Sequence, residues 1–232
     1  MADYISVPSD FAKSTFISSG VPENKIIVTP YGVNLTDFQP SERHDRAFRL
    51  VYAGQMSLRK GVHYLLQAFS ELSLPDAELW LVGPRHPEIE PFFTRFDGSF
   101  RYFEAQPERK LAEIYGKCSA FVICSLEEGL APVQLQAMAC ALPLICTTNS
   151  GGADLVCDGV EGFVLPIRDV EQLKDKILLL YQNQALAREM GRAARLRVQH
   201  GWSWDDYGSR ITGTYGRLLS VKGLGSAVGG LI

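Results

Sequence analysis

Hydrophobic and polar positions follow two alternating patterns from residue 49 onward. Short apolar runs end at glycine or a polar cluster, and each is followed by a stretch in which apolar residues recur three and four positions apart. One such stretch has Val62, Leu65 and Phe69 at the spacing of a helix face that packs on a core. Strands that alternate with helices predict βαβ units, and therefore an α/β domain with a doubly wound parallel sheet covered on both faces.

The predicted elements of this domain alternate strictly. Strands are predicted at 49–54, 78–83, 100–105, 119–125, 142–148 and 163–166. Helices are predicted at 61–72, 107–118, 133–141, near 152–157 and in the amphipathic run 169–199. In the last run, the predicted buried stripe is Leu173, Ile177 and Leu180. The predicted solvent-exposed surface of the same run is Arg188, Arg192, Arg195 and Arg197.

The first residues of the chain do not continue this pattern. Two short strand-like runs enclose a helix-like run, and a linker-like stretch follows them. This order predicts one βαβ fragment that belongs to a different sheet. The expected organisation is the fragment with its linker at 1–40, the main domain at 41–200, a helix at 201–219 and a flexible glycine-rich tail at 220–232.

Composition narrows the classes of function. The chain has 26 acidic and 23 basic residues that are mixed along the sequence, so no surface for nucleic acid or an anionic membrane is expected. The longest apolar runs are far shorter than the roughly 20 residues that a membrane span needs. The N-terminus lacks the pattern of a signal peptide. These features favour a cytoplasmic protein that binds small molecules.

Cysteines and histidines show no spacing typical of a metal site or a catalytic triad. The cysteines, which we expect to be reduced residues of the core, are Cys118, Cys124, Cys140, Cys146 and Cys157. The histidines, to which we assign structural roles, are His44, His63, His86 and His200.

Charged residues and glycines cluster where the predicted strands end. Arg59 and Lys60 follow the first strand, Glu127 and Glu128 follow the fourth, and the glycine pair 151–152 follows the fifth. Because the carboxyl ends of parallel strands meet at one edge of a sheet, these three loops are expected to converge on one crevice. A lysine and the free N–H groups at a helix N-terminus favour phosphate. The sequence therefore predicts a diphosphate site at this edge.

An ordered series of motifs at these loops resembles a known family, the retaining glycosyltransferases of family 4, also called group 1. The resemblance covers residues 3–219 and is carried by VPSDFAKSTFISSGVPENKIIVTPYGVN, VYAGQMSLRKGVHYLLQAF, LWLVGP, SLEEGLAPVQLQAMACALPLI, GGADLV and DGVEGFVLP. The resemblance implies a GT-B fold with two Rossmann-like lobes. This chain would be the C-terminal, donor-binding lobe with a remnant of the N-terminal lobe.

The resemblance also implies an activity. Members transfer a hexosyl group with retention from a nucleotide-diphospho-sugar, here UDP- or GDP-linked, and require no cofactor or metal. A saccharide or lipid acceptor would bind through the N-terminal lobe, which is mostly missing, so the isolated chain is expected to be inactive or weakly active. The chain is expected to be cytoplasmic, without an integral membrane segment or a nucleic-acid partner, and peripheral attachment to the inner membrane through the missing lobe is left open.

Family roles transfer to this sequence position by position. Lys60 matches the lysine that contacts the donor diphosphate. Glu128 matches the first glutamate of the Glu-x7-Glu motif, the catalytic position beside the donor sugar, and the N–H groups of Leu130 and Ala131 match the loop that cradles the phosphate. The full set of expected donor-binding residues is Gly54, Gln55, Arg59, Lys60, Gly83, Glu127, Gly129, Leu130, Ala131 and Gln136.

Three departures from the family pattern weaken the expected contacts. The second glutamate of the motif is Gln136, which can hydrogen-bond to ribose but carries no charge. The arginine usual after the first strand glycine is Gln55, and whether Arg59 replaces it is open. Pro132 has no N–H to donate. These departures and the missing lobe favour a second hypothesis, a non-catalytic nucleotide-binding or interaction module. A third hypothesis, an epimerase of the same two-lobed fold, is less favoured because the sequence shows no evident histidine–carboxylate pair.

Overall fold

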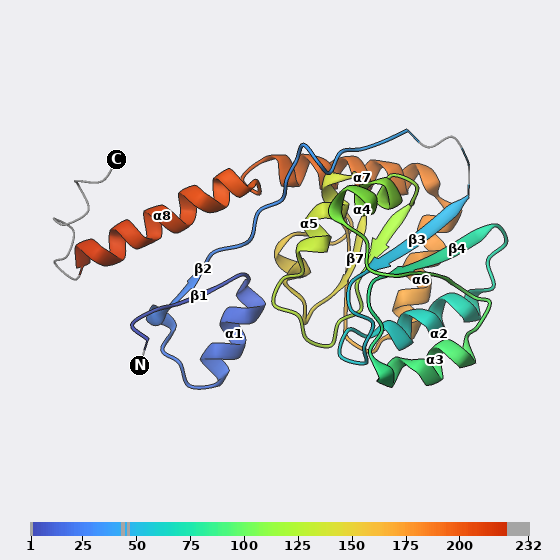
Figure 1. Cartoon of the computed structure of the whole chain (residues 1–232), viewed down its shortest axis with the longest axis horizontal. Helices are drawn as coiled ribbons and strands as arrows, with labels where there is room; N and C mark the ends of the chain where they lie inside the picture. The colour runs from blue at the N-terminus through green and yellow to red at the C-terminus, as the bar shows by residue number, and fades with distance from the viewer. Residues whose placement is uncertain (1, 43–44, 46, 222–232) are drawn as a thin grey trace.

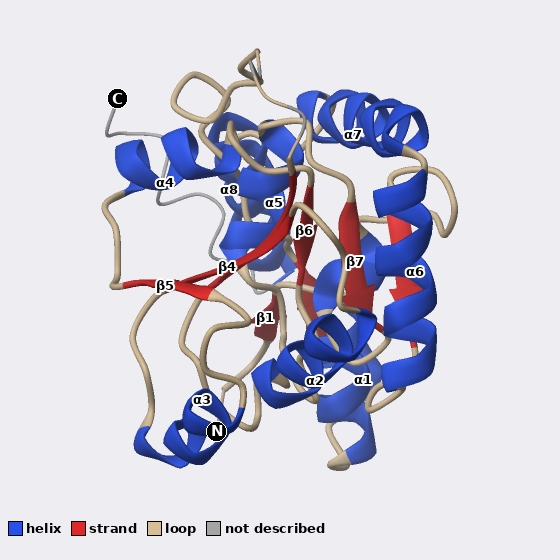
Figure 2. Cartoon of the chain, turned by 90° about the vertical axis from the view of Figure 1, so that its right-hand side faces the viewer, coloured by secondary structure: helices blue, strands red, loops and turns tan. Residues whose placement is uncertain are grey.

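The computed structural model describes residues 2–42, 45 and 47–221. In this part of the chain six parallel strands form the main sheet, in the order β5-β4-β3-β6-β7-β8 (Figures 1 and 2). Their bounds are β3 Phe48–Ala53, β4 Ala77–Val82, β5 Arg101–Phe103, β6 Ala120–Val122, β7 Leu144–Thr147 and β8 Gly162–Leu165. The predicted fold class, a Rossmann-like doubly wound α/β sheet, is confirmed.

Helices cover both faces of this sheet. Helix α2 packs against α6, and α5 packs against both α4 and α7. Right-handed crossovers place α2 on one face and α4 and α5 on the other, and the contacts put α6 beside α2 and α7 beside α5. The bounds are α2 Val62–Leu72, α3 Glu90–Arg95, α4 Glu108–Tyr115, α5 Pro132–Ala139, α6 Val170–Gln182 and α7 Gln184–Gln199.

The central strands carry the core. Every residue of β6 and β7 is buried, and β3 is buried except at one position. Strands covered on both faces need continuous apolar runs rather than alternation, which explains why the sequence shows such runs here. The predicted stripe on α6, Leu173, Ile177 and Leu180, is buried as well.

Helix assignments differ from the sequence pattern at three places. The amphipathic run 169–199 is divided at Asn183, whose side chain accepts a hydrogen bond from Leu186 and caps α7. The helix expected near 152–157 is a 3₁₀ helix, η3, at Gly151–Asp154. Helix α3 was not predicted, because six residues are too few to show a helical period.

Arg195 corrects the predicted solvent-exposed arginine surface. Its guanidinium donates hydrogen bonds to the carbonyl oxygens of Phe38 and Ala139, at 2.8 Å each, and so joins the linker to α5. Arg195 follows the buried Ala194 and lies at the border of the buried face of α7. The other three arginines, Arg188, Arg192 and Arg197, are exposed as predicted.

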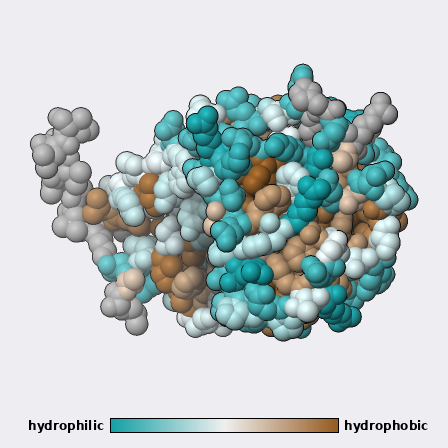
Figure 3. Space-filling model, turned by 45° about the vertical axis from the view of Figure 1, so that its right-hand side comes forward, coloured by the Kyte–Doolittle hydropathy of each residue, from teal (hydrophilic) through white to brown (hydrophobic). Residues whose placement is uncertain are grey.

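The N-terminal fragment forms a sheet of its own. Strands β1 (Ile5–Val7) and β2 (Ile26–Val28) pair in parallel, with α1 (Asp10–Ser18) and a 3₁₀ helix (Glu23–Lys25) between them. The βαβ fragment expected from the sequence is therefore present and separate from the main sheet. Figure 3 shows hydrophobic patches on this smaller part of the molecule, where Phe16 and Ile17 are among the exposed apolar side chains.

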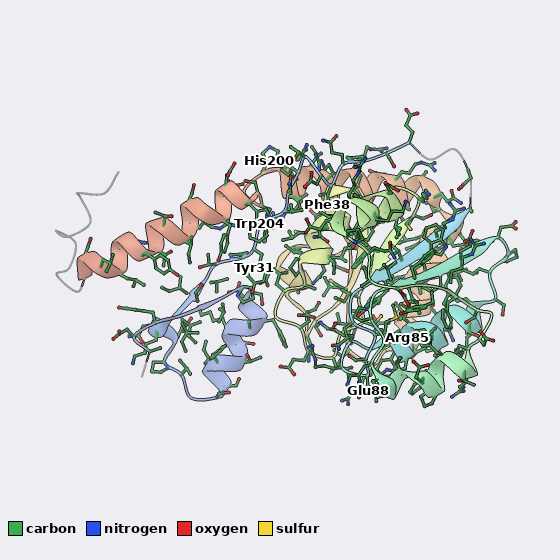
Figure 4. The ribbon with its side chains drawn as sticks, in the orientation of Figure 1. Tyr31, Phe38, Arg85, Glu88, His200 and Trp204 are labelled. Atoms are coloured by element: carbon green, nitrogen blue, oxygen red, sulfur yellow. The ribbon has the colours of Figure 1, made fainter. Side chains whose placement is uncertain are left out.

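Helix α8 (Trp204–Val221) extends from the main domain along this fragment (Figure 1). Tyr31 lies beside the helix, with its ring centroid 6.3 Å from that of Tyr207 (Figure 4), and Arg210 donates to the Pro30 carbonyl oxygen at 3.0 Å. The helix begins later than predicted and continues into the expected tail, whose residues 222–232 lie outside the described part of the chain. No helix among the described residues is both long and apolar enough to span a membrane.

The cysteines differ in exposure. Cys118, Cys124, Cys140 and Cys146 are buried, whereas Cys157 is exposed and does not have the predicted core position. Burial raises the pKa of the thiols of Cys124, Cys140 and Cys146 to about 12. The thiolate is the reactive form of cysteine, so the raised pKa and the burial both protect these thiols from chemical modification.

We therefore expect one fast-reacting thiol in the native chain. A maleimide at neutral pH should label Cys157 and leave the other four cysteines unmodified until the chain is unfolded. Mass spectrometry before and after denaturation counts the labels, and the Cys157→Ser variant should show no fast label. A second fast label in the native wild-type chain contradicts the burial of the other four.

Candidate functional site

The loops that follow β3, β6 and β7 meet at the carboxyl edge of the main sheet. These three strands are neighbours, so their loops emerge side by side. The Leu126 N–H donates to the Arg59 carbonyl oxygen at 2.9 Å, and the Glu128 N–H donates to the Asn149 carbonyl oxygen at 3.0 Å. The convergence expected from the sequence is thus present, and backbone hydrogen bonds hold it in place.

Lys60 and Glu128 form an ion pair at the centre of these loops, and each side chain is only 14% exposed. Apart from Lys60, the Glu128 Oε2 atom is buried and has no hydrogen-bond partner among the described residues. A buried charge normally needs several polar partners, and this carboxylate has fewer. The Glu128 carboxylate therefore has unused capacity to accept a hydrogen bond.

Two opposing effects act on Lys60. Burial, and to a smaller extent the positive charge of Arg59, lower the pKa of the Lys60 ammonium group to about 8. The Glu128 carboxylate, which is in contact with Lys60, acts in the opposite direction because a neighbouring negative charge favours the charged form. Gly61 lets the two loops approach, because it adopts φ +67° and a Cβ there would overlap the Cys124 carbonyl oxygen.

Free backbone N–H groups line the loop that ends at α5. The N–H groups of Gly129, Leu130 and Ala131 donate to no acceptor in the described part of the chain. Ala131 is the N-cap of α5 and supplies no side-chain cap. Pro132 then opens the helix without an N–H of its own. This cluster of donors at a helix N-terminus is suited to an anion.

Arg59 does not extend freely toward this loop. Its guanidinium Nη1 atom donates to the Glu127 carbonyl oxygen at 2.8 Å, and the side chains of Arg59 and Glu127 are both exposed. Gln55 is exposed as well, and its carbonyl oxygen accepts from the Tyr52 hydroxyl at 2.8 Å. Arg59 therefore brings a second positive charge to the site, whereas Gln55 brings none.

Gly54 and Gly83 lie at the ends of β3 and β4, where they extend the sheet by one residue each. The Gly54 N–H donates to Val82 and the Gly83 N–H donates to Phe103, both at 2.9 Å. Beyond Gly83, Glu88 (labelled in Figure 4) lies in the loop after β4. Its carboxylate accepts a hydrogen bond from the Leu58 N–H at 2.8 Å. The loop after β4 thus supports the loop that carries Lys60.

Gln136 is hydrogen-bonded to a neighbouring helix. Its amide nitrogen donates to Glu108 of α4 at 3.2 Å, while its amide oxygen is buried without a partner. No hydrogen bond among the described residues joins Gln136 to the loops that carry Lys60 and Glu128. The structure therefore brings together the predicted diphosphate residues and places the predicted ribose residue against the neighbouring helix.

Two polar residues beside the loop were not predicted. Ser9 of the N-terminal fragment is fully buried, and its hydroxyl donates to the Gly129 carbonyl oxygen. Gln134 in the first turn of α5 is also fully buried, and neither of its amide atoms has a partner. A serine directly before a helix is a sequence signal for an N-cap, but nothing local in the sequence indicates a contact across 120 positions.

Comparison with known proteins identifies the family. The family model "Glycosyl transferases group 1" matches residues 34–197. The chain belongs to this family. An uncharacterized glycosyltransferase of Methanocaldococcus jannaschii is 28% identical over 186 residues, which cover 79% of this chain and 51% of that protein. A GDP-mannose-dependent phosphatidylinositol monomannoside mannosyltransferase of Corynebacterium glutamicum is 28% identical over 206 residues, which cover 79% of this chain and 54% of that protein.

Solved structures share the fold. A sucrose-phosphate synthase from Thermosynechococcus elongatus aligns with a TM-score of 0.84 at 24% identity, over 95% of this chain and 59% of that chain. HepE from Anabaena, solved with UDP-glucose, aligns with a TM-score of 0.84 at 18% identity, over 94% of this chain and 64% of that chain. The main domain is thus the Rossmann-like C-terminal lobe of a GT-B glycosyltransferase fold, and the chain spans about half the length of the curated relatives it matches.

Proposed function

We propose that this group 1 glycosyltransferase chain binds a nucleotide-diphospho-sugar and belongs to a retaining, metal-independent hexosyltransferase of family 4. The observation that carries this proposal is the contact between Lys60 and Glu128 beside the free N–H groups of Leu130 and Ala131. A cation, a carboxylate and an anion-binding helix terminus at one edge of the sheet are the parts needed to hold a sugar diphosphate.

Lys60 and the loop at 129–131 would hold the diphosphate. The partial positive charge of the α5 N-terminus and its free N–H groups favour an anion at this position. Arg59 lies beside Lys60 and would add a second cation in place of the charge that Gln55 lacks. Because Lys60 is largely buried, its contact with a phosphate is less screened than a surface contact.

Glu128 would act on the donor sugar. When a diphosphate replaces Glu128 as the partner of the Lys60 ammonium group, the Glu128 carboxylate becomes available to the sugar next to the diphosphate. A carboxylate fixed in a site that excludes water stabilises positive charge that develops at the reacting carbon. Gln136 would hold the ribose through its unpaired amide oxygen, which accepts a hydrogen bond from a hydroxyl group.

The remaining parts of the proposal concern donor, acceptor and location. HepE is solved with UDP and UDP-glucose, and the Corynebacterium relative is GDP-mannose-dependent by name, so we propose a UDP- or GDP-linked donor. The saccharide or lipid acceptor would bind through a second lobe, to which residues 1–40 and the helix from 201 belong, and residues 41–200 form the donor lobe. We propose a cytoplasmic location, with no cofactor beyond the donor.

Nucleotide titration tests the proposal directly. Calorimetry with UDP, GDP and ADP should show binding of at least one of them. Lys60→Ala should weaken that binding roughly tenfold to a hundredfold, because a hydrogen bond to a charged group contributes about 1.5–3 kcal/mol. Lys110→Ala is the matched control, since Lys110 is exposed and pairs with Glu113 on the surface of α4. Failure of all three nucleotides to bind at millimolar concentration contradicts the proposal.

The pH dependence of binding follows from the lowered pKa of Lys60. With a pKa of about 8, the ammonium form dominates at pH 7 and is the minor form at pH 9. Affinity for the diphosphate should therefore fall about tenfold between pH 7 and pH 9. In Lys60→Arg the guanidinium stays charged over this range, so its binding should be nearly independent of pH. If affinity falls equally in the wild type and in Lys60→Arg, a group other than Lys60 causes the pH dependence.

A non-catalytic nucleotide-binding module is the second candidate. The uncharged Gln55 and Gln136, together with the coverage of about half of each relative, favour it. Hydrolysis of UDP-glucose or GDP-mannose by the chain distinguishes the two candidates, because a catalytic site shows slow turnover in the absence of an acceptor.

We expect Glu128→Gln to reduce that hydrolysis at least about a hundredfold, since it removes the charge next to the sugar. Glu113→Gln, at an exposed position on α4, should leave the rate unchanged. Product release measured by chromatography gives both rates. Detectable turnover in the wild-type chain that Glu128→Gln abolishes excludes the non-catalytic module.

A further inference from the structure

The N-terminal fragment touches the donor loop, residues 127–131 after β6, through the residue that precedes its helix. Ser9 is the N-cap of α1 and is fully buried. Its hydroxyl oxygen accepts a hydrogen bond from the Ala12 N–H at 3.0 Å and donates its proton to the carbonyl oxygen of Gly129. A single side chain therefore both starts α1 and holds the residue that follows Glu128.

A second contact lies beside the first. The Asp10 N–H donates to the Asp154 carboxylate at 2.6 Å. Asp154 is the last residue of η3, the short helix that follows the loop after β7. An acidic group at the N-terminus of α1 is also favourable for the helix dipole. The N-terminal fragment is thus attached to two of the three loops that form the site.

Backbone contacts between these two loops fix the main chain of Glu128. Its N–H donates to Asn149 and its carbonyl oxygen accepts from the Gly151 N–H, both at 3.0 Å. The packing allows no extra atom, because a Cβ at Gly151 would overlap the Gly129 carbonyl oxygen and lie 2.9 Å from the Ser9 Cβ. The main chain at Glu128 and Gly129 is therefore held by η3 on one side and by Ser9 on the other.

We propose that Ser9 is a positioning residue for Glu128, through which the N-terminal fragment sets the geometry of the donor loop. Asp154 is the second anchor of the same contact. The Ser9 side chain has no hydrogen bond to Lys60 or Glu128 among the described residues, so its effect passes through the Gly129 carbonyl. The proposal rests on the proposed function for the role of Glu128 and its loop in donor binding. If both hold, donor affinity depends on how the N-terminal fragment is placed.

Amide hydrogen exchange measured by NMR on the ligand-free chain tests the positioning role. Ser9→Ala should speed exchange of the Glu128 and Gly151 N–H groups roughly threefold to tenfold, the effect of losing one hydrogen bond next to them. The Leu65 N–H, which bonds to the Gly61 carbonyl oxygen in α2, is the internal reference and should not change. Equal exchange at Glu128 and Gly151 in the variant and the wild type overturns the proposal.

Two sets of variants separate this role from general destabilisation of α1. Ser14→Ala removes a hydroxyl that donates to Phe11 within the same helix at 2.7 Å and has no partner across the contact, so the site amides should exchange as in the wild type. Asp154→Ala should speed exchange at Gly151, whereas Asp154→Asn, which keeps an oxygen acceptor, should restore it. If Ser9→Ala does not fold, this second pair decides the question.

UDP titration of the same variants links the contact to the site. Ser9→Ala should bind UDP about threefold to tenfold more weakly than the wild type, because a less ordered loop must be ordered on binding. Ser14→Ala should bind as the wild type does. If Ser9→Ala speeds amide exchange but leaves UDP affinity unchanged, Ser9 contributes only to local stability and the proposal is overturned. If no variant binds UDP, GDP or ADP, the proposed function fails, while the exchange experiment still decides whether Ser9 positions the loop.

Discussion

The contact between Lys60 and Glu128 depends on the parallel order of three strands. Because β3, β6 and β7 are neighbours and run in the same direction, the loops at their carboxyl ends emerge at one edge. Backbone hydrogen bonds between these loops then hold the cation and the carboxylate together, although 68 positions separate them in the sequence. An antiparallel strand at any of these three positions would send its loop to the opposite edge and remove the site.

This ion pair is better suited to exchange partners than to stabilise the fold. Two largely buried charges lose hydration, and one oxygen of Glu128 has no other hydrogen bond to compensate for the loss. Burial and the charge of Arg59 lower the pKa of Lys60 to about 8, so the charged form is less favoured than in an exposed lysine. A diphosphate beside the free N–H groups at the start of α5 would offer Lys60 a stronger partner.

The sequence was informative where function follows from the position of a residue along a strand–loop–helix unit. Lys60 and Glu128 could be placed at the same edge because each follows a predicted strand, and the alternation of elements is a strong signal. Arg195, Ser9 and Gln136 could not be placed in this way. Their contacts are with Phe38, Gly129 and Glu108, on elements that no local pattern brings near them. Such contacts depend on tertiary packing, which periodicity does not encode.

The N-terminal fragment connects the site to the part of the chain that lies outside the main domain. Its two strands have three residues each, and a two-stranded sheet of that size is marginal by itself, so both open edges favour pairing with further strands. The same fragment reaches the donor loop through Ser9. Binding energies that share one structural element are linked in both directions. If the chain binds the proposed donor and Ser9 positions Glu128, whatever orders the fragment must tighten donor binding, and a bound donor must stabilise the fragment by the same factor.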